Sequence, residues 1–219
     1  AYISFLLIFL TFGLETGYFR FINKYKDDNN VYSSAFSFIL LLSILFLLAT
    51  SFFSVGISSA LGQSYLPIYI ITTAAIVVLD SITALPFAKL RNQNRPIVFS
   101  FIKISGVLVN VSLNILFYLI LSPEDLKQII PTVDVLYFVF LSNLIQNIFV
   151  VILVLYFTSI PKIKFQKKLL KELLWYSFPI LLAGLSGTTN EAFDRLFIKY
   201  LLPTNVDSLY QLGIYGACV

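Results

Sequence analysis

Charged side chains occur inside long apolar stretches of this sequence, where they could bind an ion or a charged substrate. Glu15, Asp80 and Lys103 are clear cases, and Asp80 follows a stretch with no acidic or basic residue from Asn29 to Leu79. An ionisable group near the centre of a membrane costs at least a few kcal/mol, so it usually has a partner or a function. The carboxylates could hold a coupling H⁺ or Na⁺ or balance a cation, and the lysine could attract an anion.

Amide side chains recur at helical spacing on two segments and form one stripe on each. They are Asn110 and Asn114, in line with Lys103 and Gly106, and then Asn143, Gln146 and Asn147. One interpretation is that the two stripes hydrogen-bond to each other as neighbouring helices. The other is that they line a hydrated cavity whose positive charge comes from Lys103.

Other polar residues near the ends of apolar segments have two interpretations each. Glu15 lies between Gly13 and Gly17, a pair that lets another helix approach closely, so it serves that contact or a cavity. Arg20 either faces a cavity or extends to the membrane interface. Asp80 shares a helix face with Thr73 and Thr83, which favours a functional, hydrated face.

The last long apolar segment carries several charges in its second half. They are Glu191, Asp194, Arg195 and Lys199. Glu191 and Arg195 are four residues apart with the acid first, which predicts an intrahelical ion pair. Alternatively these charges are solvated, because the segment is longer than a bilayer core of about 30 Å requires.

Membrane-spanning helices must position these residues. Of the 219 residues, 58% are hydrophobic and only 12% are charged, against roughly 25% in a soluble domain. Apolar windows separated by polar breaks predict helices over 1–22, 34–58, 65–88, 97–121, 133–157 and 173–202, with another beginning near Tyr210. The sequence predicts an all-α, polytopic membrane helical bundle. With no His and one Cys, we expect no metal site, no cofactor and no Cys/His nucleophile.

Basic residues alternate between successive connections. Eleven of the fifteen follow the first, third and fifth spans: Arg20, Lys24, Lys26, Lys89, Arg91, Arg95, Lys162, Lys164, Lys167, Lys168 and Lys171. An excess of Lys and Arg marks the cytoplasmic side, so we expect Ala1 on the external side. If the true N-terminus is cytoplasmic, an odd number of spans, most simply one opening helix, precedes Ala1. The sequence has no Met and ends in an apolar stretch, so we expect a fragment of a longer chain.

Residues 162–175, KIKFQKKLLKELLW, combine five lysines with apolar residues, which suits an amphipathic helix on an anionic leaflet. This segment is either a connector between two bundles or a basic loop. We expect a first bundle over 1–158, a basic connector over 159–174 and the start of a second bundle over 175–219.

Three stretches together resemble the polysaccharide-export branch of the multidrug/oligosaccharidyl-lipid/polysaccharide flippase superfamily. They are FGLETGYFRF (12–21), LPFAKLRNQNRPIVFS (85–100) and YSFPILLAGLSGTTNEAFDRLFI (176–198). The resemblance implies a protein of twelve to fourteen helices in two bundles around a lumen. It also implies outward movement of undecaprenyl-pyrophosphate-linked sugars by alternating access in the bacterial inner membrane, for lipopolysaccharide, capsule or exopolysaccharide.

A pyrophosphate in such a lumen would need cationic or amide donors, so the two sets of polar residues have different expected roles. The substrate candidates are Arg20, Lys103, Asn110, Asn114, Asn143 and Arg195, and the ion-coupling or charge-balancing candidates are Glu15, Asp80, Glu191 and Asp194. The expected partners are the lipid bilayer, a lipid-linked oligosaccharide and other glycan-assembly membrane proteins, with no nucleic acid. The alternatives are a multidrug efflux transporter of the same superfamily and a membrane-embedded glycan polymerase or ligase.

Overall fold

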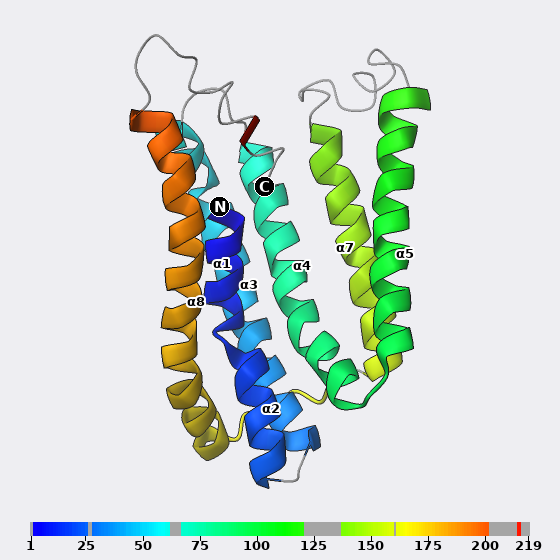
Figure 1. Ribbon diagram of the computed structural model, residues 1–219, viewed down its shortest axis with the longest axis vertical. Helices are drawn as coiled ribbons and strands as arrows, with labels where there is room; N and C mark the ends of the chain where they lie inside the picture. Colours follow the sequence, from blue (N-terminus) through cyan, green and yellow to red (C-terminus); the bar gives the residue numbers. More distant parts are fainter. Residues whose placement is uncertain are drawn as a thin grey trace.

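The computed structural model of the protein is a bundle of long helices (Figure 1). It describes residues 2–25, 28–61, 67–120, 137–159, 161–201 and 214–215. Its elements are α1 (Tyr2–Thr11), α2 (Leu14–Tyr25), α3 (Asp28–Leu61), α4 (Pro67–Asn92), α5 (Pro96–Ile115), the π-helical η1 (Leu116–Ile120), α7 (Tyr137–Thr158) and α8 (Lys167–Leu201). Among these residues six stretches are long and apolar enough to cross a membrane, which confirms the predicted polytopic helical bundle.

The first predicted span, over 1–22, is confirmed as a stretch able to cross a membrane over Ile3–Tyr25, but its helix is broken in the middle and is not continuous as predicted. Phe12 and Gly13 have φ angles of 53° and 65°, in the left-handed region, and they separate α1 from α2. Glycine adopts this conformation without a steric penalty, which allows the chain to change direction here. The break matters for the site because it gives α1 and α2 separate orientations.

Two other helices begin earlier than predicted. α3 begins at Asp28 instead of residue 34, and α8 begins at Lys167 instead of residue 173. Both extensions are polar turns that lie beyond the apolar windows, where hydropathy alone cannot locate a helix end. Residues 167–174 of the expected surface connector are therefore the first turns of α8, and the connector is non-helical over 161–166.

The predicted break between the third and fourth spans is confirmed. Asn94, with a φ of 53°, lies between α4 and α5, and Asn tolerates the left-handed region better than most residues. The backbone N–H of Arg95 donates to the carbonyl of Leu90 at 3.1 Å, and Pro96 then occupies the first turn of α5. The turn brings the end of α4 beside the start of α5.

Helix α4 lies between two groups of helices (Figure 1). On one side it packs against α1, α2 and α3, and on the other against α5 and α7. Leu85 and Ala88 of α4 belong to a buried cluster with α2, α3 and α8, whereas Phe87 and Leu90 belong to one with α5 and α7. Side chains of α4 therefore reach both groups and can meet polar residues from either.

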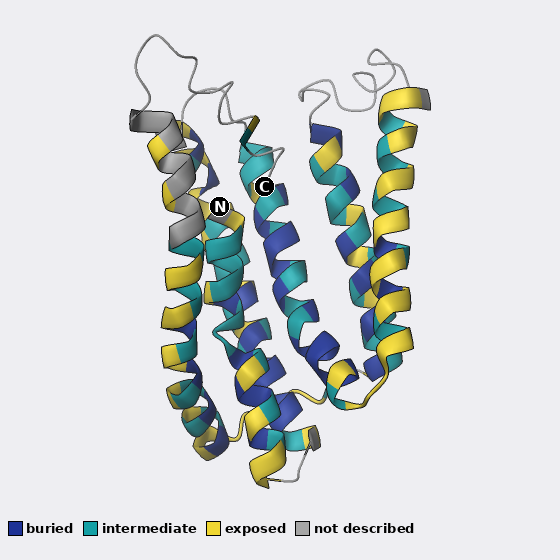
Figure 2. Ribbon diagram, in the orientation of Figure 1, coloured by how far each residue is buried: buried dark blue, intermediate teal, exposed yellow. Residues whose placement is uncertain are grey.

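The outward faces of the bundle are apolar and exposed, as lipid contact requires. Figure 2 shows exposed residues along the outer sides of α5 and α8 and buried residues concentrated on α4. Large apolar side chains such as Phe52, Leu119 and Trp175 are 82%, 80% and 83% exposed. A soluble protein rarely exposes so much apolar surface, so these faces are suited to the hydrocarbon core.

The basic connections all lie at one end of the bundle, here called the basic end. Helices α2, α4 and α7 end there, and α3, α5 and α8 begin there (Figure 1). The alternation of connections inferred from the sequence is therefore reproduced by the fold. Helix α8 also packs against α1, α2 and α3, and the division into two bundles at residues 159–174 stays a prediction.

Candidate functional site

A cavity of about 510 Å³ lies between α1, α2, α4 and α5 and contains four charged side chains. We call it the charged cavity. Its lining residues are Leu7, Ile8, Thr11, Glu15, Asp80, Thr83, Ala84, Phe87, Arg91, Phe99 and Lys103. Both acids and the lysine were predicted as site residues, and the structure brings them together from three helices.

The α4 wall of the cavity is one helical stripe. Asp80, Ala84, Phe87 and Arg91 follow one another at steps of four, three and four residues, and Thr83 lies beside Ala84. Asp80 and Arg91 are three turns apart, or about 16 Å along the helix axis. Asp80 lies near the middle of α4 and Arg91 near the basic end, so the cavity extends from that end toward the middle of the bundle.

Glu15 and Arg91 form an ion pair at the basic end of the cavity. The Nη2 atom of Arg91 donates to Oε2 of Glu15 at 2.6 Å, and the guanidinium carbon lies 5.6 Å from the centre of the Phe19 ring. Both side chains are partly accessible, at 49% for Arg91 and 38% for Glu15. The pair therefore joins α2 to α4 and still faces the cavity.

Arg91 was missed as a site residue, because the third predicted helix ended at residue 88 and Arg91 was counted with the basic loop. The structure continues α4 to Asn92. A helix extended through Arg91 places it on the same face as Asp80, since eleven residues complete about three full turns. The spacing between Asp80 and Arg91 indicated a shared helix face, but the predicted helix ended before Arg91.

Asp80 lies deeper in the cavity, near Lys103 and Asn147. Lys103 comes from α5, and its Nζ lies 4.4 Å from the centre of the Phe87 ring. Thr83 donates its hydroxyl to the Asp80 carbonyl at 2.8 Å, so it supports the backbone here. Thr73, predicted on the same face, does not line the cavity. Asp80 and Lys103 lie on opposing helices as an acid and a base, so they can balance each other's charge or exchange a proton.

Gly17 on α2 and Gly13 just before it allow α8 to approach closely, as their spacing predicts. A Cβ atom added to Gly17 would lie 2.6 Å from Oγ of Ser177, and one added to Gly13 would lie 3.1 Å from Cγ2 of Ile180. The contact faces α8, whereas Glu15 faces α4 and the cavity. Of the two interpretations of Glu15, the structure favours the cavity.

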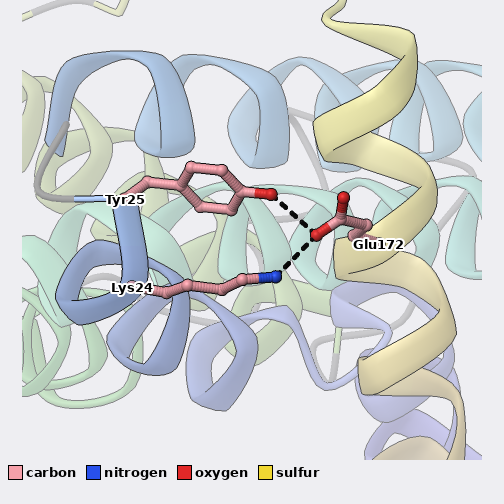
Figure 3. A network of polar contacts seen from close by, with 3 residues as sticks. All are labelled: Lys24, Tyr25 and Glu172. Carbon is pink, nitrogen blue, oxygen red and sulfur yellow. Dashed lines mark hydrogen bonds and ion pairs between the residues drawn. The ribbon is translucent and has the colours of Figure 1, made fainter.

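A polar network at the basic end fixes α2 to the start of α8 (Figure 3). Lys24 Nζ lies 2.8 Å from Oε2 of Glu172, and the Tyr25 hydroxyl donates to the same oxygen at 2.7 Å. Lys24 and Tyr25 approach the carboxylate from adjacent positions at the end of α2 (Figure 3). Unlike the Glu15–Arg91 pair, this network lies outside the charged cavity.

The amide stripes of α5 and α7 are joined by hydrogen bonds. Asn110 donates to Oδ1 of Asn143 at 3.0 Å, Asn114 donates to Oδ1 of Asn110 at 2.9 Å, and the Ser142 hydroxyl donates to Oδ1 of Asn114 at 3.2 Å. Gly106 allows the close approach, since an added Cβ would lie 2.7 Å from Val150. None of the three asparagines lines the charged cavity. The geometry favours hydrogen bonding between helices over a lumen for these residues.

Arg20 is also separate from the charged cavity. Its guanidinium carbon lies 4.2 Å from the centre of the Tyr176 ring on α8, and the residue is exposed. A contact of this geometry is a cation–π interaction. Arg20 follows Glu15 by five positions, which places the two residues on different faces of α2. The structure does not bring Arg20 together with Lys103.

The helix α8 includes positions 190–201, but the side chains of Glu191, Asp194 and Arg195 lie outside the described residues. Their expected roles and the Glu191–Arg195 ion pair stay predictions. Of the helix expected to begin near Tyr210, the structure describes Ile214 and Tyr215, which are helical, and the other positions lie outside the described residues.

The family model described as polysaccharide biosynthesis protein matches residues 1–218. The chain belongs to this family. No curated protein and no solved structure matches the chain. The family match confirms the family suggested by the three sequence stretches. Together with the six spans, it makes the chain a multi-pass membrane protein of polysaccharide biosynthesis.

Proposed function

We propose that this chain belongs to a flippase that moves undecaprenyl-pyrophosphate-linked oligosaccharide across the bacterial inner membrane by alternating access. The product would supply lipopolysaccharide, capsule or exopolysaccharide. The family supports the role in polysaccharide biosynthesis. The observation that carries the transport proposal is the charged cavity, which places Lys103, Asp80 and the Glu15–Arg91 pair inside a membrane-spanning bundle.

The two cations of the cavity are suited to a pyrophosphate. Phosphate oxygens accept strong, charge-assisted hydrogen bonds from Lys and Arg, and a low dielectric strengthens these bonds. Lys103 makes no ion pair with a carboxylate in the described part of the chain. Arg91 is bound to Glu15, so a pyrophosphate at the basic end would compete with that carboxylate for the guanidinium. In this proposal, substrate arrival separates Arg91 from Glu15.

The acids of the cavity complete the proposed cycle. Once Glu15 is released from Arg91, it needs a new partner, because an unpaired charge in a membrane is costly. A proton or Na⁺ can meet that need at Glu15 or at Asp80. By linkage, an ion bound to Glu15 would leave Arg91 free for the substrate and so favour the loaded state, and release of the ion would let the pair form again and return the transporter to its starting state.

Export in cells tests the proposed class. In a strain that lacks the full-length gene, we expect lipid-linked glycan units to accumulate on the cytoplasmic side and surface glycan to disappear, with both restored by the wild-type gene. A glycan polymerase would give a different result, namely single repeat units that still reach the outer side. A ligase would leave finished glycan on its lipid carrier there. Either of these patterns would contradict a flippase.

A further inference from the structure

A buried lysine near the basic end of α4 has no acidic partner in the part of the chain that the structure describes. Lys89 is 7% exposed, and its Nζ lies 4.2 Å from the centre of the Tyr32 ring on α3. The ion pairs between described residues involve Lys24 and Arg91, and neither involves Lys89. An aromatic ring offsets only part of the cost of burying an ammonium group, so Lys89 calls for an anion.

Lys89 lines a pocket of about 320 Å³, here called the basic pocket, which is separate from the charged cavity. Lys162 and Lys164 from the segment after α7 line it as well. The backbone N–H of Lys164 donates to Oγ of Ser37 at 3.2 Å, which holds this segment against α3. No Asp or Glu is among the pocket's described lining residues. Three ammonium groups around one space create a positive potential that favours an anion.

The start of α3 forms another wall of the basic pocket. Asn29 and Ser33 line it, and α3 begins at Asp28. The first turn of a helix has backbone N–H groups without helical partners and carries the positive end of the helix dipole. Such groups bind phosphate well. The helix start alone would not define a site, but here it faces the same space as the buried Lys89.

We propose that the basic pocket binds the phosphate of an anionic phospholipid from the leaflet at the basic end. The pocket lies where α3 begins and α4 and α7 end, which is the level of the lipid headgroups for helices that cross the bilayer. Basic pockets between membrane helices on the cytoplasmic side are suited to anionic headgroups. The bound lipid would tie α3, α4 and the segment after α7 together. This inference does not depend on the transported substrate.

Native mass spectrometry of the purified full-length protein tests the site. Titration with phosphatidylglycerol in a neutral detergent should show a retained lipid, and phosphatidylcholine should not replace it. Lys89→Met should weaken phosphatidylglycerol binding at least about tenfold, because one charge-assisted hydrogen bond to phosphate is lost. Lys171→Met is the matched control, since it removes an exposed charge at the same end outside the pocket, and it should leave the affinity unchanged.

Thermal unfolding without anionic lipid separates loss of binding from loss of folding. Lys89→Met should be at least as stable as wild type there, because it removes a buried charge, and phosphatidylglycerol should stabilise only the wild type. Equal phosphatidylglycerol affinity in wild type and Lys89→Met would overturn the site. If millimolar inorganic phosphate binds and displaces the lipid, the pocket serves a soluble anion and the lipid assignment is wrong.

Discussion

Arg91 of α4 donates to Glu15 of α2 at 2.6 Å, and this ion pair forms one end of a cavity that also contains Asp80 and Lys103. The two residues are 76 positions apart in the sequence. Because both side chains are partly accessible, we expect the pair to add only about 1 kcal/mol or less to the free energy of unfolding. We expect the loss of this pair to impair transport clearly while it changes stability only slightly.

Changes to this pair should therefore reduce export more than they reduce folding. We expect Glu15→Gln and Arg91→Gln each to lower surface glycan at normal protein abundance, because each leaves one charge of the cavity unbalanced. The Lys24–Glu172 pair is a matched control, since its side chains are similarly accessible, at 55% and 33%, and lie outside the cavity. If Glu172→Gln lowers export as much as Glu15→Gln does, the special role of the cavity pair is contradicted.

The spans could be predicted from the sequence, because long apolar runs are sufficient to locate membrane helices. The break at Phe12–Gly13 could not, because a glycine within an apolar run is equally compatible with a continuous membrane helix. The polar first turns of α3 and α8 also lie beyond what hydropathy can locate. These differences depend on local backbone geometry and tertiary contacts.

The candidate site was predicted in part for a similar reason. Asp80 and Lys103 could be found because a charge inside an apolar run is conspicuous. Arg91 sits beyond the apolar run and looks like a loop residue, although its spacing from Asp80 puts it on the same helix face. Arg20 was grouped with Lys103 by charge alone, and the structure places it against α8 instead.

Replacement of Gly17 tests the contact between α2 and α8. We expect Gly17→Ala to destabilise the purified protein by about 1–3 kcal/mol, because the added methyl would overlap Ser177 Oγ. Ser177→Ala should largely restore stability, because Cβ of Ser177 is 4.0 Å from the added atom and its hydroxyl has no hydrogen-bond partner among the described residues. Gly187→Ala, which meets nothing within 4 Å, is the control. Thermal unfolding in detergent gives the stability of the wild type, Gly17→Ala, Gly17→Ala with Ser177→Ala, and Gly187→Ala. If Ser177→Ala does not restore the stability lost in Gly17→Ala, the contact is contradicted.

Substitution of Asn143 distinguishes a helix–helix hydrogen bond from a substrate contact. Asn143→Ala removes the acceptor of the Asn110 bond, so we expect a loss of about 0.5–1.5 kcal/mol in unfolding free energy. Export per protein molecule should remain close to wild type, because the residue does not line the charged cavity. Surface glycan and protein abundance are to be measured together. Loss of export without loss of stability would show that the amides contact the substrate.

Orientation in the membrane can be tested by labelling single cysteines with an impermeant thiol reagent. In a Cys218→Ala background, Gln93→Cys and Lys164→Cys should be protected in intact cells and labelled after permeabilisation, because both lie at the basic end. Lys127→Cys, in the connection between the fourth and fifth spans, should be labelled in intact cells. Labelling of positions 93 and 164 in intact cells would invert the proposed orientation.

Reconstituted flipping by Lys103 variants tests the central claim most directly. Full-length protein in liposomes, with lipid-linked pyrophosphate glycan in one leaflet, should transfer this lipid at a measurable rate. Lys103→Gln should reduce the rate at least about tenfold because one cation for the pyrophosphate is lost, whereas Lys103→Arg should retain most of it. Lys171→Gln, an exposed lysine outside the charged cavity, should flip like wild type. A wild-type rate for Lys103→Gln would contradict the claim that the charged cavity carries the substrate.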